Sequence, residues 1–310
     1  MSKISIVIPV YYNSDTLEML YADMKEKILT QLGDYEIVFV DDGSKDNSWE
    51  VMNKIRLTDK NVVCVRLAHN FGEHTAILAG MSVSSGDCVV TKQADLQEDS
   101  TLILQMFESW KRGNKVVLAI REQRDEGAIK KFFAGCYYFL VRKFINKDMP
   151  SGGCDCYLID KQVADVLVNS KEKNSSLTLQ VMWSGYTTEK IYFHRLDRTV
   201  GISRWTMGKK VKLVVDSLIS FTYVPIRLMT YSGLAFFVFA LMGAIDVIHE
   251  KLTVGTPIAG YASLMCVILF AFGLVLLNLG ILGEYIWRVL EEARKRPMFL
   301  IDEVKKSADK

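Results

Sequence analysis

The chain has little of what marks a disordered, fibrous or nucleic-acid-binding protein. Its 310 residues include only 20 glycines and 5 prolines, and half of them are hydrophobic, which excludes collagen-like and low-complexity chains. The formal net charge is only +2, so no general electrostatic attraction to nucleic acid is expected. No internal repeat is found. The length predicts a folded protein of about two domains.

Charged side chains are scarce in residues 228–287, where only four occur: Asp246, Glu250, Lys251 and Glu284. Leu228 to Ile245 and Leu252 to Gly283 carry no charge at all. Because a transmembrane helix needs about 20 apolar residues, two membrane spans are predicted, near 228–248 and 260–283. A buried core helix is the alternative interpretation of the first span.

Basic residues flank both predicted spans, and the loop between the spans has no net charge. The basic residues are Lys209, Lys210, Lys212 and Arg227 before them, and Arg288, Arg294, Lys295 and Arg296 after them. The positive-inside rule therefore predicts cytoplasmic positions for both termini and for the region before residue 227. The early apolar run Ile4–Val10 is too short for a signal-peptide core.

The six cysteines give a poor signal for a metal site. Only Cys154 and Cys156 lie close in sequence, and a C-x-C pair without a second pair is not a zinc pattern. Reduced, structural thiols are expected in a cytosolic domain.

The first 120 residues alternate between two patterns. Short, β-branched, nearly continuous apolar runs predict buried parallel strands at Ile4–Val10, Glu36–Val40, Val62–Leu67, Cys88–Thr91 and Val116–Ile120. Helical patterns lie between them, at about 15–31, 46–58, 73–84 and 99–112. This alternation predicts an open, Rossmann-like α/β sheet with ligands at the carboxyl ends of its strands.

Four segments follow the predicted strands and carry polar or aromatic groups: Pro9–Tyr12, Val40–Ser44, Asn70–His74 and Gln93–Gln97. Paired carboxylates before a glycine can hold a base or a ribose, although D-D-G-S is equally often a turn. An aspartate with neighbouring oxygen donors suits a divalent metal that bridges a diphosphate. A lone aspartate there more often caps the next helix.

In this order the motifs are specific. I-V-I-P-V-Y, V-D-D-G-S-x-D, H-N-F-G, A-D-L-Q and R-E-Q-R resemble the inverting glycosyltransferases of family 2, which have the GT-A fold. More narrowly, the chain is similar to polyprenyl-phosphate glycosyltransferases, the relatives of dolichol-phosphate mannose synthase and bactoprenol glucosyltransferases. The resemblance continues through Arg198–Trp205, Leu282–Arg288 and Arg296-Pro297, and so covers nearly the whole chain.

The resemblance implies a role for each matching position. Pro9, Tyr11, Asp41, Asp42, Asn70 and Gly72 would bind the nucleotide-sugar, together with Asp95. Asp95 and Gln97 would hold Mg²⁺ or Mn²⁺, and Arg121 would meet phosphate. Asp155 would be the catalytic carboxylate, with Asp95 and Arg121 beside it. The residues that would bind the lipid phosphate are Arg198, Ser203 and Arg204.

Three positions depart from the family pattern. Gln93 replaces the first acid of D-A-D-L-Q, Tyr157 replaces an arginine, and Arg204 stands for the usual lysine. The first change removes one negative charge from the predicted metal site. The second changes the charge on the acceptor side, and the third keeps charge while altering geometry.

The predicted reaction is transfer of a sugar, with UDP-glucose as the first choice of donor, to polyprenyl (undecaprenyl) phosphate with inversion at the anomeric carbon. The partners would be the nucleotide-sugar, the polyprenyl phosphate, the lipid bilayer and further copies of the chain. The expected location is a bacterial inner membrane. A processive polysaccharide synthase fits less well because Gly201 stands where Q-x-x-R-W needs glutamine. A catalytically inactive sugar-nucleotide sensor is the alternative from another class.

The predicted organisation has four parts. Residues 1–205 form a cytoplasmic GT-A domain and 206–227 an amphipathic helix at the headgroups, where Lys209, Lys210 and Lys212 would face solvent. Packing of this helix on the soluble domain is the alternative. Residues 228–287 form the two membrane helices, and 288–310 a cytoplasmic tail.

Overall fold

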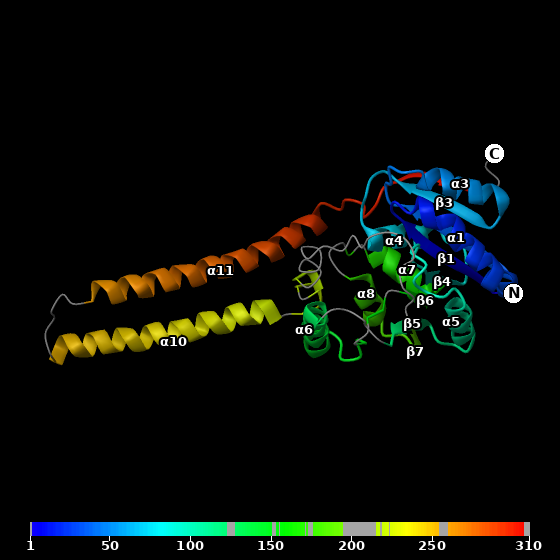
Figure 1. The fold of residues 1–310 in the computed structure, drawn as a ribbon. Coiled ribbons are helices and arrows are strands. Elements are labelled where there is room, and N and C mark those ends of the chain that lie inside the picture. Colours follow the sequence, from blue (N-terminus) through cyan, green and yellow to red (C-terminus); the bar gives the residue numbers. More distant parts are fainter. Residues whose placement is uncertain are drawn as a thin grey trace. The chain divides into compact units, whose positions relative to one another are not determined.

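A computed structural model describes residues 2–122, 128–150, 153–154, 156–170, 172, 176–194, 215–217, 219–222, 224–253 and 260–306. The chain divides into two compact units. The first comprises Met1–Ser217 together with Pro297–Lys310, and the second comprises Leu218–Arg296. Each unit is described by itself (Figure 1).

The first unit is built on an eight-stranded sheet with the order β7-β5-β6-β4-β1-β2-β3-β8. The strands are β1 Lys3–Val10, β2 Asp34–Asp41, β3 Val62–Leu67, β4 Cys88–Thr91, β5 Val116–Arg121, β6 Cys156–Asp160, β7 Thr188–Phe193 and β8 Ile301–Lys305. All five strands predicted from the apolar runs are present. β1 pairs in parallel with both β2 and β4, which confirms the Rossmann-like GT-A sheet.

Three strands were not predicted. β6 lies antiparallel between β4 and β5, and β8 lies antiparallel on β3 at the sheet's edge. β7 and β8 are edge strands that each contain charged residues, so neither shows the continuous apolar run of a buried strand. Part of the predicted tail 288–310 is therefore a strand of the sheet.

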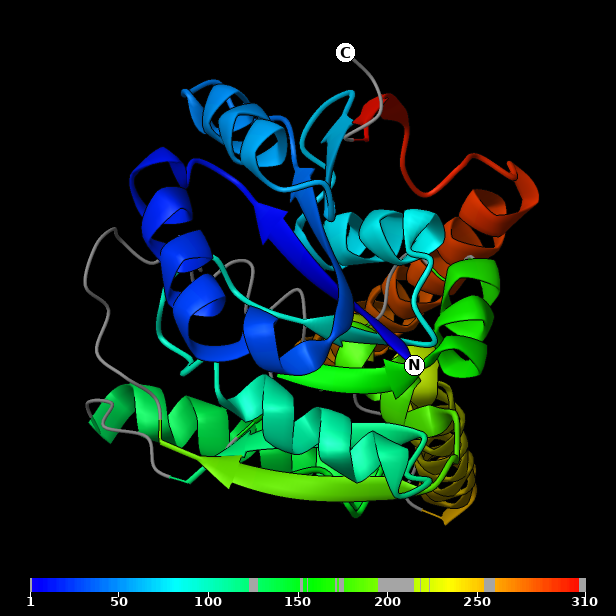
Figure 2. The same ribbon diagram turned by 90° about the vertical axis from the view of Figure 1, so that its right-hand side faces the viewer.

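Helices cover both faces of the sheet (Figure 2). They are α1 Ser14–Met24, η1 Lys25–Leu29, α2 Thr30–Leu32, α3 Ser48–Thr58, α4 Glu73–Val83, α5 Leu102–Lys111, α6 Ala128–Phe144, α7 Lys161–Ser170 and α8 Leu177–Trp183. The four predicted helices are found, and the pattern at 15–31 divides into α1, the π-helical turn η1 and the short α2.

Alternate residues of each central strand enter two separate cores. Ile4, Ile6 and Ile8 of β1 pack with α1, α3 and α5, while Val7 packs with α4 and α7. Contact with α4 is so close that a Cβ on Gly80 would lie 2.4 Å from a Val7 methyl carbon. A residue larger than glycine would push α4 off the sheet, and with it the turn before α4.

The second unit consists of two helices, α10 Val224–Thr253 and α11 Tyr261–Ala293. Both are long and apolar enough to cross a membrane, and the most apolar stretches, Val224–Gly243 and Phe270–Ala293, are not buried. The helices contact each other through Phe236 and Phe270, whose ring centres lie 5.8 Å apart. Exposed apolar surface along both described helices does not fit the core helix of a soluble protein.

Most of the predicted interfacial helix 206–227 lies outside the described residues. Residues 215–217 and 219–221 are helical, and α10 begins at Val224. The amphipathic pattern of this segment stays a prediction.

Candidate active site

The carboxyl ends of β1, β2 and β4 meet at one edge of the sheet. Val10 at the end of β1 pairs with Asp41 at the end of β2. The Asp42 amide donates to the Val10 carbonyl (2.8 Å), and the Lys92 amide after β4 donates to the Val7 carbonyl (3.0 Å). Three of the four predicted site segments therefore begin at neighbouring points, as the parallel topology requires.

Asp41 is completely buried at the end of β2. Its Oδ1 accepts a hydrogen bond from the Ser44 amide (3.0 Å), and its Oδ2 forms an ion pair with Arg66 Nε at 3.6 Å. Burial raises the pKa of Asp41 against the opposing effects of Ser44 and Arg66. Gly43 has a φ of 71°, and a Cβ there would lie 2.7 Å from the Asn70 amide nitrogen, so the turn requires glycine.

Asp42 organises the turn between β3 and α4. Its carboxylate accepts hydrogen bonds from the side-chain amide of Asn70 (2.9 Å), from the Phe71 amide (2.7 Å) and from the Gly72 amide (2.9 Å). Burial raises its pKa, against the lowering effect of the two backbone donors. The direct nucleoside contact predicted for Asp42, Asn70 and Gly72 stays a prediction. In the structure, the hydrogen bonds of Asp42 hold the β3–α4 turn in place.

The end of β1 presents an aromatic side chain. Pro9 lies within the buried strand, paired with Val40. Tyr11 is 37% exposed and packs edge-on against Tyr12 with ring centres 4.7 Å apart. Tyr12 has a φ of 57°, and its amide donates to Ser44 Oγ at 3.0 Å. The Tyr11 ring is therefore partly exposed at the end of β1, where an aromatic face can pack on a planar ligand.

The end of β4 carries the predicted metal ligands. Asp95 and Gln97 are half-buried, and the Gln97 amide donates to Asp95 Oδ1 at 3.2 Å. Leu96 between them has a φ of 59°, which places the two side chains on one tight turn. Among the described residues, no group of three or more histidine, cysteine, aspartate or glutamate side chains is arranged to hold a metal ion.

Two departures from the family pattern meet at Glu73, which sequence reasoning did not single out as a site residue. Gln93 Nε2 donates to Glu73 Oε1 at 2.6 Å. Tyr157 is almost fully buried, and its hydroxyl has no hydrogen-bond partner among the described residues. Burial raises the pKa of Tyr157, and the Glu73 charge contributes. The carboxylate of Glu73, on α4, therefore lies next to residue 93, the position where the family pattern has an acid.

A buried cluster joins the ends of β4 and β5. Lys92 Nζ donates to the backbone carbonyl of Glu98 at 2.9 Å, and both residues are almost inaccessible to solvent. Burial raises the pKa of Glu98; Lys92 and Arg121 lower it and Asp95 adds to the rise. Arg121 and Asp95 thus both lie close enough to the buried Glu98 carboxyl to change its pKa. A lysine and a glutamate in a polar loop give no sequence signal of burial.

The remaining predicted site residues, Asp155, Arg198, Ser203 and Arg204, lie outside the described residues. The cysteines on either side of Asp155 are described. Cys154 and Cys156 are buried free thiols, and burial raises the pKa of Cys154 to about 12. Both therefore stay protonated near neutral pH and act as structural side chains.

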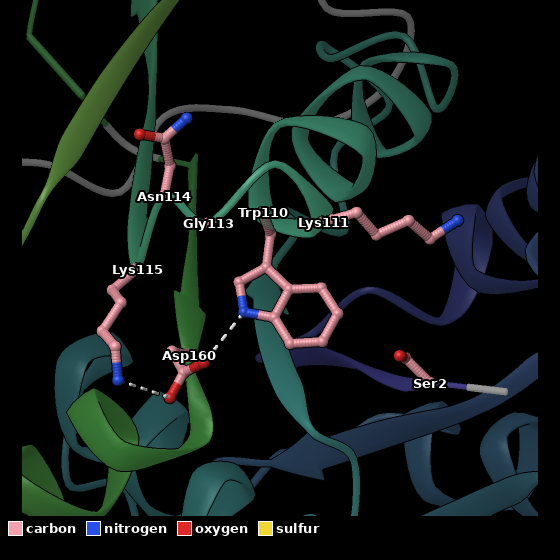
Figure 3. Close-up of a pocket in the computed structure, with 7 residues that line it drawn as sticks. All are labelled: Ser2, Trp110, Lys111, Gly113, Asn114, Lys115 and Asp160. Carbon is pink, nitrogen blue, oxygen red and sulfur yellow. Dashed lines mark hydrogen bonds and ion pairs between the residues drawn. The ribbon is translucent and has the colours of Figure 1, made fainter.

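One surface pocket lies at the opposite edge of the sheet, at the amino ends of β1 and β5 (Figure 3). Trp110 Nε1 donates to Asp160 Oδ2 at 3.0 Å, and Lys115 Nζ lies 3.8 Å from Asp160 Oδ1. Ser2, Lys111, Gly113 and Asn114 complete its lining. Asp41, Asp42 and Asp95 do not line it, so it is separate from the candidate site.

A sheet of this order, with acids and a glycine turn at the carboxyl ends of its central strands, defines the class: a domain of the GT-A fold. The family model "Glycosyl transferase family 2" matches residues 5–167. The chain belongs to glycosyltransferase family 2, and it is a glycosyltransferase.

Its relatives resemble it over nearly their whole length. The chain is 35% identical to "Uncharacterized glycosyltransferase YkcC" of Bacillus subtilis, over 96% of this chain and 92% of that protein. It is 32% identical to the "Bactoprenol glucosyl transferase" of Shigella phage SfV, over 96% and 98%. Among solved structures, mannosyl-3-phosphoglycerate synthase from Rubrobacter xylanophilus is 13% identical with a TM-score of 0.49, over 69% of this chain and 71% of that one.

Proposed function

We propose that this glycosyltransferase moves a hexose, with glucose from UDP-glucose as first choice, onto polyprenyl phosphate at the cytoplasmic face of a membrane. The full-length similarity to a protein named as a bactoprenol glucosyl transferase supports the acceptor class. The strand-end site of a family 2 domain, in a chain that also carries two exposed apolar helices, is the observation that carries the proposal.

The donor half of the site uses the ends of β1 and β2. The exposed Tyr11 ring offers a face for the base, and the buried Asp41 shapes this end of the site through Ser44 and Arg66. Asp42 acts by holding the Asn70–Gly72 turn. The N-terminus of α4 follows this turn directly, and its free amides favour a phosphate group.

The residues after β4 fit a divalent cation of the Mg²⁺ or Mn²⁺ type. Asp95 and Gln97 would supply a carboxylate and an amide oxygen, and such ions are usually held by one or two carboxylates together with substrate phosphates. Among the described residues no cluster of three or more metal-binding side chains is found, and a site of this kind would leave positions for the substrate phosphates. When bound, the cation neutralises charge on the leaving diphosphate.

The reaction is a single displacement. A phosphate oxygen of the acceptor attacks the anomeric carbon, the bond to the diphosphate oxygen breaks, and the nucleoside diphosphate leaves. Arg121, at the end of β5, stabilises the negative charge that grows on the diphosphate. Asp155 orients the acceptor or stabilises the cationic sugar, because the acceptor phosphate is already ionised. Arg198, Ser203 and Arg204 bind the lipid phosphate.

A transfer assay tests this function. Purified chain is incubated with a short polyprenyl phosphate, Mg²⁺ or Mn²⁺, and a panel of UDP- and GDP-sugars. Formation of polyprenyl-phosphate hexose from one donor supports the proposal. Nucleotide-sugar binding without any transfer would instead favour a sensor.

The proposed topology has its own test. A reporter fused after Lys310 should report the cytoplasm, and one inserted near Thr253, at the end of α10, should report the opposite side. Cytoplasmic signals from both positions would contradict the hairpin.

A further inference from the structure

The segment that follows α11 returns to the catalytic domain. Residues 297–306, here called the C-terminal strap, contain β8, which pairs antiparallel with β3 from Cys64↔Lys305 to Leu67↔Ile301. The Ala68 amide donates to the Leu300 carbonyl at 2.9 Å. The strap therefore closes the edge of β3 up to the point where that strand ends.

Apolar side chains hold the strap on the face of the sheet that α4 covers. Met298, Phe299, Ile301 and Val304 pack against the core cluster that includes Val65, Leu67 and Ile77. The contact therefore joins the strap to both elements that bound the β3–α4 turn.

Charged groups link the strap to Trp49 of α3. The Arg66 guanidinium and the Lys305 ammonium each lie 5.4 Å from the Trp49 ring centre. Arg56 Nη1 donates to the Lys306 carbonyl at 2.7 Å. Arg66 of β3 and Lys305 of the strap thus share the Trp49 ring as a cation–π partner.

Arg66 connects this edge to the donor half of the site. Its Nε lies 3.6 Å from Asp41 Oδ2, and β3 leads through Ala68 into the turn that Asp42 holds. The strap thus lies beside both aspartates at the end of β2: its Trp49 side adjoins Arg66, and its apolar side packs on the end of β3.

We propose that the C-terminal strap is a positioning element of the nucleotide site, which holds Arg66 against Asp41 and keeps the Asn70–Gly72 turn in its binding shape. The inference rests on the proposed function, since it assigns the nucleotide of the donor to this edge. The chain from the end of α11 to the start of β8 comprises only residues 294–300. The strap is thus joined to α11 of the second unit by a short covalent link.

Ile301→Asp in the full-length chain tests the inference, because it places a charge on the apolar side of β8. UDP binding is measured by calorimetry, and hydrogen exchange is followed at the Phe71 and Gly72 amides, which donate to Asp42. We expect about a tenfold loss of UDP affinity, the size of one weakened charge-assisted contact, with faster exchange at both amides.

Two matched variants serve as controls. Asp302→Ser changes the exposed side of the same strand and should leave both readouts unchanged. Val62→Ala opens a cavity in β3 outside the strap's register and controls for general destabilisation.

Unchanged UDP affinity in a chain whose β3 amides have lost protection would overturn the inference. Equal loss of affinity in Val62→Ala would do the same, as would unfolding on loss of the strap, since the strap would then only stabilise the domain. If the unaltered chain binds neither UDP nor GDP, the proposed function fails instead. Exchange at Phe71 and Gly72 still reports the strap's effect in that case.

Discussion

The ends of β2 and β4 both carry aspartates, but the protein surrounds them differently. Asp41 and Asp42 after β2 are buried, and their carboxylates bond to Ser44, Arg66 and the β3–α4 turn. Asp95 after β4 is half-exposed on a tight turn with Gln97. A carboxylate whose oxygens are bound by protein donors shapes the site, whereas one that solvent can reach is able to meet a ligand.

The largest difference between the two strand ends is expected from Asp95→Asn. Under the proposed role of Asp95 at the diphosphate and its cation, loss of its charge should lower transfer by about 100- to 1000-fold, while the midpoint of thermal unfolding stays unchanged. Asp99→Asn, in the same loop but exposed and paired with Lys27, is the control. Near-normal turnover at saturating Mg²⁺ or Mn²⁺ would remove Asp95 from the mechanism.

Asp42→Asn should instead lower the stability of the fold. An amide NH₂ would face a backbone N–H of the turn, so we expect a loss of about 2–3 kcal/mol in the free energy of unfolding, measured with denaturant. Asp302→Asn on the exposed side of β8 should cost almost nothing. Full stability with loss of UDP binding would mean that Asp42 contacts the nucleotide directly.

Moving a negative charge between residues 73 and 93 tests how the end of β4 binds a metal ion. Gln93→Asp alone places two carboxylates together, since residue 93 contacts Glu73 at 2.6 Å, and repulsion will favour protonation of one of them. Combined with Glu73→Gln, the same change should tighten Mn²⁺ binding about tenfold relative to Glu73→Gln alone, through the added charge beside Asp95. Equal tightening in both backgrounds would show that Glu73 does not act on this site.

The smallest expected effect is a pH dependence at the end of β2. Burial raises the pKa values of Asp41 and Asp42, so the folded chain binds more protons than the unfolded chain. Their contribution to the free energy of unfolding therefore falls as the pH rises from about 4, the unfolded value, through the raised values. Asp41→Asn should flatten this decline, measured by denaturant unfolding at several pH values.

Glu36 provides a contrast of opposite sign. Burial alone would raise the pKa of Glu36, but hydrogen bonds from Ser5 and Ser85 outweigh burial and lower it. Its contribution therefore grows as the pH rises toward about 4.3, and Glu36→Gln should remove that rise without changing the decline above it. A flat profile in the unaltered chain would contradict both assignments.

Much of the central sheet could be predicted because its strands have local signatures. The runs at Ile4–Val10 and Val62–Leu67 are buried on both faces and read as continuous apolar sequence. β7 and β8 could not be predicted, since each mixes charged with apolar residues and neither contains a fully buried residue. Their place in the sheet depends on pairing with strands far away in the sequence.

The candidate site divides in the same way. The strand-end positions of Tyr11, Asp41 and Asp95 follow from the topology, and the sequence placed them correctly at one edge. Glu73 and Lys92 could not be assigned, because nothing in their local sequence shows that one meets Gln93 and the other is buried against the Glu98 carbonyl.

The sequence by itself determined the order of strands and helices in the first half and the two helices long enough to span a membrane. Each of these depends on hydrophobic periodicity over a few helical turns or a few strand residues. The strand-end acids follow, because they come directly after the predicted strands. Only the tertiary structure decided which acids the protein itself binds and where the C-terminal strap lies. The Arg56–Lys306 hydrogen bond joins residues 250 positions apart. Such contacts form only when the sheet has brought both partners to one edge, so no local pattern can encode them.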